Sequence, residues 1–252
     1  MMRRRNASRG FTLVELMVAL VIALVAMLAA ISLYVGTRQT YRIQGMQSRL
    51  SEDGRFAISM LQRLTLQAGF RDNPATAITA GYITPVTSSQ FTVKFTGDNV
   101  NTVGCSGAAV TGAQSLTISE NSTDKKLTCG AVDWIAPAGS GTELMDFLVE
   151  YGVDSGPNTT PAEYGCGADI ASTVYKERDC VADAYPVAAT ALASMDKIVA
   201  LRFCLVLRTE DTDVSVNKNA AYKDCSNVDI ANSQTDHKLY RTFRTTVQVR
   251  NR

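Results

Sequence analysis

The first feature of the sequence is an uninterrupted apolar run near its N-terminus. It extends from Phe11 to Val35, and between Leu16 and Leu33 it contains no charged residue, no proline and no glycine. About 20 apolar residues are enough to span the hydrocarbon core of a bilayer. The run is apolar on all sides, so no face of it suits water. We therefore expect residues 11–35 to form a transmembrane helix.

After Gly36 the apolar pattern becomes one-sided. Apolar residues recur at steps of three and four, with one position skipped at Gly54: Ile43, Met46, Leu50, Ala57, Leu61, Leu64 and Ala68. This spacing is typical of an amphipathic helix, and Gly69 followed by Asp72-Asn73-Pro74 is a stop signal. The sequence predicts one helix from about Thr12 to Ala68, with residues 36–69 as its amphipathic half. Gly36, Gly45 and Gly54 are positions where it can bend.

Beyond Pro74 the pattern changes to short alternating runs. Apolar and polar residues alternate in 91–96, 115–119, 145–153, 199–208 and 243–250. A period of two is typical of half-buried strands, largely antiparallel. In 145–153 the odd-numbered residues share the apolar face, and the alanine-rich stretch 181–193 suits a short helix after Pro186. We predict an α+β fold, with the amphipathic helix half packed on an antiparallel β-sheet and 70–252 forming one β-rich domain.

Charge limits the choice of partners. The whole chain has a net charge of +1, but residues 1–10 hold four arginines and no acid, and the remainder has 21 bases against 24 acids, a net charge of −3. This balance argues against a dedicated nucleic-acid binder, and four arginines are too few to favour a basic tail that binds nucleic acid. A positive leader stays in the cytoplasm, which places the domain on the other side of the membrane.

Six cysteines lie beyond the apolar run: Cys105, Cys129, Cys166, Cys180, Cys204 and Cys225. An even number without a Cys-x-x-Cys pair, next to a membrane-insertion signal, favours disulfides in an oxidising compartment. We expect neighbours in sequence to pair, as 105–129, 166–180 and 204–225, because each bond then closes a short loop. The alternative is buried free thiols.

Catalytic and metal-binding candidates are weak. The only histidine, His237, follows Asp236 in a polar stretch, where we expect both side chains to be solvated. No Gly-x-Ser-x-Gly motif supports a catalytic triad. The stretch 211–217 has the acidic spacing of a calcium loop, but it has Val216 where the loop needs Gly and Tyr222 where it needs Glu. We expect no enzyme, no metal and no cofactor.

Glu15 is the only charge inside the apolar run. A carboxylate within a membrane helix is costly unless it is paired. If the chain is cut after Gly10, Phe11 carries a new α-amine close to the membrane surface. That amine, in the same helix or in a neighbouring one, is a natural partner for Glu15. The alternative is a glutamate near the helix end whose carboxylate reaches water.

The stretch Arg9-Gly10-Phe11-Thr12-Leu13-Val14-Glu15, followed by the apolar run, resembles the class III signal of type IV prepilins and of type II secretion pseudopilins. The resemblance implies that a prepilin peptidase removes residues 1–10 by cutting between Gly10 and Phe11. It also implies that Phe11 is N-methylated and that Glu15 pairs with a neighbour's terminal amine during assembly.

Three further stretches, 51–57, 198–208 and 243–251, are similar to minor pilins of the PilW type. This resemblance implies a prepilin that inserts in the inner membrane with its domain in the periplasm and later becomes part of the pilus. Such a subunit works with other minor pilins and the major pilin to initiate assembly, at the pilus tip, and serves twitching motility and cell adhesion. The chain differs from many major pilins in its six cysteines and in an apolar helix without proline.

Two other functions fit the same sequence. One is a pseudopilin of a type II secretion system, which uses the same chemistry in another machine. The other is a bitopic membrane protein with an uncut leader, whose outer domain binds a ligand without polymerising.

Overall fold

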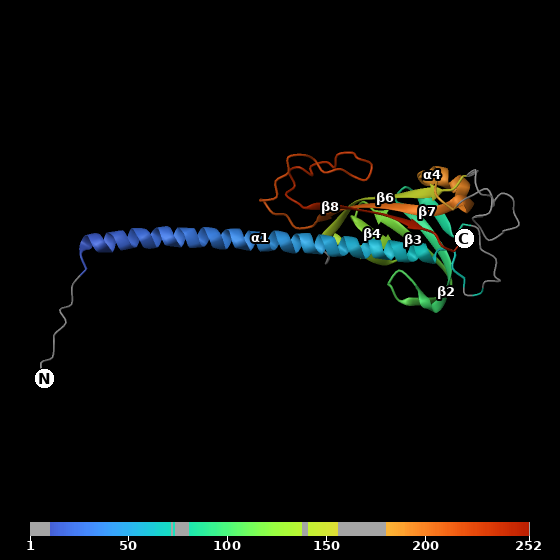
Figure 1. The fold of residues 1–252 in the computed structure, drawn as a ribbon, viewed down its shortest axis with the longest axis horizontal. Helices are drawn as coiled ribbons and strands as arrows, with labels where there is room; N and C mark the ends of the chain where they lie inside the picture. Colours follow the sequence, from blue (N-terminus) through green and yellow to red (C-terminus); the bar gives the residue numbers. More distant parts are fainter. Residues whose placement is uncertain (1–10, 72, 74–80, 138–140, 156–179, 252) are drawn as a thin grey trace, which may run out of the picture. The chain divides into compact units, whose positions relative to one another are not determined.

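A computed structural model of the chain describes residues 11–71, 73, 81–137, 141–155 and 180–251. The chain divides into two compact units, Met1–Gly45 and Met46–Arg252. One helix, α1 (Leu13–Gln67), contributes to both units (Figure 1). The prediction of a single helix from about Thr12 to Ala68 is therefore confirmed.

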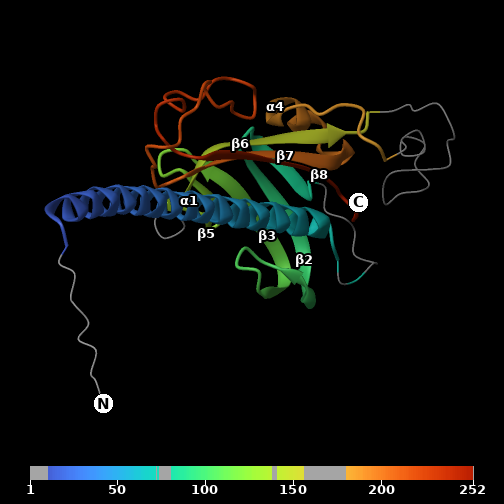
Figure 2. The same ribbon diagram turned by 60° about the vertical axis from the view of Figure 1, so that its left-hand side comes forward.

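The second unit contains two antiparallel sheets (Figures 1 and 2). The five-stranded sheet keeps the order of the chain: β1 (Ile83–Thr87), β2 (Gln90–Val103), β3 (Ala109–Asn121), β4 (Lys126–Cys129) and β5 (Val132–Ile135). The three-stranded sheet has the order β6 (Thr142–Val153), β7 (Ile198–Thr209) and β8 (Tyr240–Gln248). The α+β class and all five predicted strands are confirmed, whereas β1, β4 and β5 were not predicted.

The sequence predicted one sheet, and the structure shows why there are two. The free edge of β6 meets turns of the five-stranded sheet instead of one of its strands. The Val149 N–H donates to Ser88 O (2.8 Å) and the Leu144 N–H donates to Lys125 O (2.9 Å). The short helix expected after Pro186 is present as α4 (Ala188–Ala191), and a 3₁₀ turn, η1 (Leu192–Lys197), follows it.

The apolar stripe of α1 and both sheets share one core. Leu61 and Leu64 are fully buried and belong to the same cluster as Phe91 on β2 and Phe203 on β7. The rings of Phe91 and Phe203 lie 5.4 Å apart between their centroids and so join the two sheets. Full burial of each such side chain stabilises the domain by about 2 kcal/mol. The amphipathic half of the helix is therefore held by tertiary packing.

The predicted face of β6 is wrong at its first residue. The pairing of β6 with β7 shifts between Leu144 and Asp146, and Met145 lies in this irregularity. Leu144 is buried there, whereas Met145 is only half-buried. A bulge places an extra residue on one strand and changes which side chains face the core. The alternation holds again at Phe147, Val149 and Tyr151, all of which are buried.

Gly54 is a packing position and not a weak point of α1. A Cβ atom built on Gly54 would lie 2.1 Å from Cζ of Phe243 on β8. The ring of Phe243 therefore occupies the space that any side chain at this position would need. The position skipped in the apolar stripe is the place where the Phe243 ring of β8 packs on the helix.

The C-terminal end of α1 is held by the last residues of the chain. Gly69 has a φ of +74°, the left-handed conformation that commonly follows a helix, and a Cβ there would lie 2.0 Å from Asn251 O. The Asn251 side-chain amide donates to Leu66 O (2.9 Å). The buried side chain of Gln67 accepts the Val103 N–H (2.6 Å). The predicted stop at Gly69 is confirmed.

Two acidic side chains meet where β3 approaches β6. Burial and the nearby carboxylate of Asp146 raise the pKa of Glu120 to about 7, although the Phe147 N–H opposes this by donating to Glu120. Burial also raises the pKa of Asp146, which accepts the Cys225 N–H (2.7 Å). The folded protein therefore disfavours the ionised form of Glu120, at this junction between the sheets, more than the unfolded chain does.

We predict that Gly54→Ala lowers the free energy of unfolding by about 1–2 kcal/mol, because overlap with Phe243 outweighs the better helix propensity of alanine. Gly45→Ala is the matched control: it has nothing within 4 Å and should not destabilise the protein. In a Phe243→Ala background, Gly54→Ala should no longer be destabilising. Urea unfolding of the full chain in detergent, followed by fluorescence of Trp134, the only tryptophan, measures all three.

We predict that stability falls as the pH rises from about 4.5 towards 7. Across this range folded Glu120 keeps a proton that the unfolded chain releases, so unfolding becomes more favourable with rising pH. Glu120→Gln keeps an oxygen that accepts the Phe147 N–H but cannot ionise. It should raise the stability at pH 8 by on the order of 1–2 kcal/mol, allowing for solvent screening, and change little at pH 4.5. The same urea titration at both pH values tests this, with Glu52→Gln on α1 as the control.

Candidate assembly site

The N-terminal end of α1 carries the residues singled out by the sequence. Gly10 lies outside the described residues, and Phe11 and Thr12 come immediately before the first helical residue, Leu13. Phe11 is 85 % exposed. Glu15 is the acidic residue in the first turn of the helix. This position suits a carboxylate because the free N–H groups of a helix make its N-terminus positive.

Glu15 and Thr12 form a reciprocal cap. The Glu15 N–H donates to Thr12 Oγ1 (3.2 Å), while Glu15 Oε2 accepts the Thr12 N–H (3.2 Å) and the Thr12 hydroxyl (3.1 Å). This is the capping box that Thr-x-x-Glu forms at a helix start. Thr12 was not among the partners predicted for Glu15, although the Thr-x-x-Glu spacing in the sequence is the signal for this cap.

The carboxylate keeps one oxygen for another partner. Both hydrogen bonds from Thr12 end on Oε2, and within the described part of the chain no hydrogen bond to Oε1 is made. Glu15 is also in no ion pair with a described residue. The cap therefore orients the side chain but leaves its charge uncompensated.

The apolar part of α1 is exposed within the described chain. An 18-residue window of the helix has a mean hydropathy of 2.9, and none of it is buried against the rest of the protein. By length and composition this segment can cross a membrane. Two aliphatic hydroxyl groups of this part bond to the helix backbone: Ser32 Oγ donates to Ala29 O (2.8 Å) and Thr37 Oγ1 donates to Leu33 O (2.8 Å). Such bonds allow a polar side chain to stay in an apolar surrounding.

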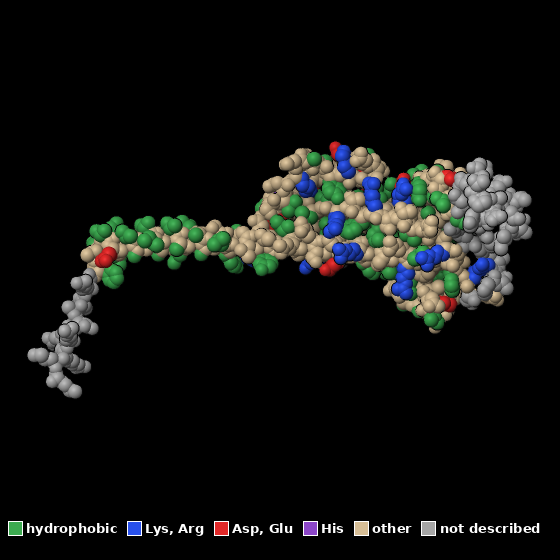
Figure 3. Space-filling model, viewed as in Figure 1, with side chains coloured by type: hydrophobic (Ala, Val, Ile, Leu, Met, Phe, Trp, Pro, Cys, Tyr) green, Lys and Arg blue, Asp and Glu red, His purple; other side chains and the backbone are tan. Residues whose placement is uncertain are grey.

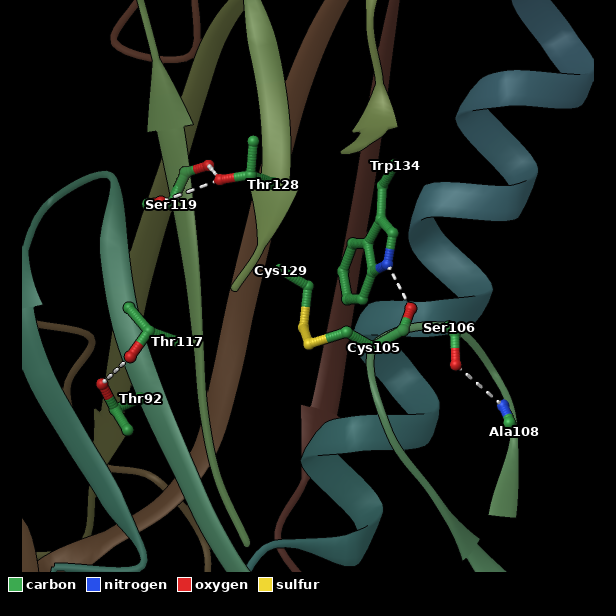
Figure 4. The surroundings of a disulfide bond; sticks show 9 residues. All are labelled: Thr92, Cys105, Ser106, Ala108, Thr117, Ser119, Thr128, Cys129 and Trp134. Atoms are coloured by element: carbon green, nitrogen blue, oxygen red, sulfur yellow. Dashed lines mark hydrogen bonds between the residues drawn. A yellow bond between two sulfur atoms is a disulfide. The ribbon is translucent and has the colours of Figure 1, made fainter. Parts of the chain in front are cut away.

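Two of the three predicted disulfides are formed between described residues. Cys105 is bonded to Cys129, and Figure 4 shows the Trp134 side chain beside this bond, with its Nε1–H donating to Cys105 O (2.8 Å). The bond ties the β2–β3 loop to the end of β4. Closing a loop of about this length contributes roughly 3 kcal/mol.

Cys204 on β7 is bonded to Cys225 in the β7–β8 loop, residues 210–239. Cys180 is disulfide-bonded as well. The Cys166–Cys180 pairing stays a prediction because Cys166 lies outside the described residues. The alternative of buried free thiols is wrong for the five cysteines that the structure describes.

Family models match two parts of the chain. Residues 5–31 match the prokaryotic N-terminal methylation motif. Residues 116–251, more than half of the chain, match type IV pilus-assembly protein W, PilW. The chain belongs to the PilW family.

The solved structures similar to this PilW-family chain include a type IV-like pilin from Thermus thermophilus. The two are 13 % identical, the match covers 81 % of this chain and 96 % of that one, and the TM-score is 0.44. A search of curated proteins found no match.

Asp236 and His237 take part in the structure of the PilW-family domain, so the prediction that they are solvated is wrong. Asp236 contacts Arg208 (3.5 Å) and Lys218 (2.9 Å), while Nδ1 of His237 lies 3.0 Å from Val216 O. Arg208 also pairs with Glu143 on β6. Burial disfavours the ionised form of Glu143, but Arg208 and Lys238 outweigh it and hold the pKa of Glu143 below its ordinary value. This network fastens the β7–β8 loop to the three-stranded sheet.

The acidic stretch of the same loop forms a turn. Asp213 is buried, and its Oδ1 accepts the N–H (3.0 Å) and the hydroxyl (2.6 Å) of Ser215. Among the described residues of this PilW-family chain, no group of three or more His, Cys, Asp or Glu side chains is placed to hold a metal ion. The acidic spacing is therefore used by a local turn.

Proposed function

We propose that this chain is a minor pilin that is inserted in the inner membrane as a prepilin and takes part in initiating type IV pilus assembly, at the pilus tip. The observation that carries the proposal is the bare apolar segment of α1 with a single capped but unpaired carboxylate in its first turn. Membership of the PilW family supports a role in a type IV pilus rather than in a type II secretion system. The function is assembly and involves no catalysis by this chain.

The first step is insertion and processing. The basic leader stays in the cytoplasm, and the domain lies in the periplasm, where disulfides form. Prepilin peptidase cuts between Gly10 and Phe11, and Phe11 is then N-methylated. The match of residues 5–31 to the N-terminal methylation motif supports this step. The subunit remains anchored because the cut lies before the apolar helix.

The second step is the exchange of lipid for protein neighbours. The apolar helix leaves the membrane and packs among the helices of other minor pilins and of the major pilin. Glu15 Oε1 then receives the α-amine of a neighbouring Phe11, so the charge that was uncompensated in the single subunit is neutralised. The Thr12 cap keeps the carboxylate in place before the partner arrives. A charge pair inside an apolar bundle is strong because water does not screen it.

We expect the mature protein to begin at N-methylated Phe11 and to lack residues 1–10. Mass spectrometry of the N-terminal peptide from the inner membrane and from sheared pili measures this. Cells without prepilin peptidase are the control and should retain the leader. A chain that still begins at Met1 in cells with active peptidase would contradict the proposal and favour the non-polymerising bitopic protein.

We expect Glu15→Ala and Glu15→Gln to insert normally in the membrane but to lower incorporation into pili on the order of tenfold, since both remove the charge. The glutamine variant separates two roles, because Gln keeps the capping box. Immunoblots of membrane and pilus fractions measure the effect. If Glu15→Gln assembles like the wild type, the cap and not the charge is what assembly requires.

A further inference from the structure

Charge is distributed unevenly over the globular domain. Residues 46–68 of α1 lie against β8 and the residues that follow it up to Asn251. In the sequence, 46–68 and 240–252 together contain seven arginines and two acids, a net charge of +5. Residues 69–239 contain twelve basic and twenty-one acidic residues, a net charge of −9. Figure 3 shows Lys and Arg side chains spread over the face along which the second half of α1 runs, with few Asp and Glu among them.

The arginines of these two segments differ from the other bases in having no acidic partner. Within the described residues, none of the following six is in an ion pair: Arg49, Arg55, Arg63, Arg241, Arg244 and Arg250. By contrast, seven of the nine Lys and Arg residues described between Gly81 and Leu239 are in ion pairs. Among the described residues the fold thus pairs most of the bases between Gly81 and Leu239 with acids and leaves these six arginines unpaired.

Two of these arginines, Arg55 and Arg241, belong to the α1–β8 seam, which we define as Ser51, Arg55, Gln62, Arg241, Phe243 and Thr245. Arg241 Nη1 donates to Ser51 Oγ (2.6 Å), and its guanidinium lies 5.4 Å from the centroid of the Phe243 ring. Arg55 is one helical turn after Ser51, so it projects from the same side of α1. Further along, Gln62 Nε2 donates to Thr245 Oγ1 (3.0 Å).

The seam is built to bind an anion. Arg241 is held at two points but uses one donor in the described contacts, and a guanidinium has five. Arg55 is exposed and makes no hydrogen bond to a described residue. Glu52, three residues before Arg55 on the helix, accepts a hydrogen bond from Ser48 (3.0 Å), and neither Glu52 nor Asp53 is in an ion pair with Arg55. Guanidinium groups with unused donors favour carboxylates, which they can bind with two parallel hydrogen bonds.

We infer that the α1–β8 seam docks the acidic surface of a neighbouring pilin subunit, with Arg55 and Arg241 binding its carboxylates. This inference rests on the proposed function and specifies a lateral contact of the assembled subunit. The chain itself contains the complementary charge, because residues 69–239 carry the net charge of −9. Subunits that share this division of charge fit side by side, the arginine seam of one against the acidic face of the next.

Arginine footprinting with phenylglyoxal tests the seam in the full-length protein. The reagent is applied to inner membranes that hold the stored subunit, to sheared pili, and to pili dissociated in detergent, and modified peptides are quantified by mass spectrometry. We expect Arg55 and Arg241 to react in membranes, to react about tenfold less in pili, and to react again after dissociation.

The outcomes separate this inference from the proposed function. If the chain is absent from pili, the proposed function fails and the seam contact with it. If it is present and Arg55 and Arg241 stay reactive, only the seam contact is wrong. Protection that already exists in membranes would identify lipid as the occupant, and protection that a nuclease removes would identify nucleic acid. Either result would overturn the inference that an acidic pilin subunit occupies the seam.

Charge reversal gives a second measurement. Arg55→Glu alone should lower incorporation into pili about tenfold, and Arg55→Glu with Arg241→Glu should lower it further. Lys94→Glu on β2 is the matched control, since Lys94 is also exposed and in no described ion pair, and it should assemble like the wild type. Because Arg55 makes no described contact, its reversal leaves the fold intact, which Trp134 fluorescence checks. Normal assembly of the double variant would overturn the inference.

Discussion

The packing of one helix stripe against two sheets is the interaction on which the globular domain depends. Leu61 and Leu64 reach a core shared by Phe91 of one sheet and Phe203 of the other. The sheets meet through turns and through this core, to which the helix stripe contributes. Gly54 lets Phe243 approach the helix, and Asn251 closes its C-terminal end. The position of β8, and with it the β7–β8 loop, follows from these contacts.

The same helix is used in two different surroundings. Its second half is amphipathic and belongs to the domain, whereas its first half is apolar all round and is not buried by the described chain. Hydroxyl groups such as Ser32 are satisfied by the helix backbone. The apolar half can therefore exchange lipid for other helices without any change in its own hydrogen bonds. Glu15 is the exception, because Thr12 bonds only to its Oε2 and cannot neutralise its charge.

Local patterns made much of the fold predictable, and non-local contacts account for the errors. The helix and the five long strands have a period that their own residues reveal. The strands β4 and β5 have four residues each, too few for a reliable alternation. Met145 was placed in the core because a bulge cannot be read from alternation alone. At the assembly site Glu15 was found from its charge, whereas Thr12 was missed although its spacing from Glu15 predicts a capping box.

The sequence by itself determined the apolar half of the helix, the extent of the helix, the α+β class and the two disulfides seen between sequence neighbours. Each of these depends on residues close together in the chain. Only the tertiary structure decided that the ring of Phe243 packs on Gly54 and that burial beside Asp146 raises the pKa of Glu120. It also decided that Arg55 and Arg241 belong to one seam without an acidic partner among the described residues. Burial and ion pairing depend on which distant segments the fold brings within a few ångströms of each other. A local pattern in the sequence does not show which segments these are.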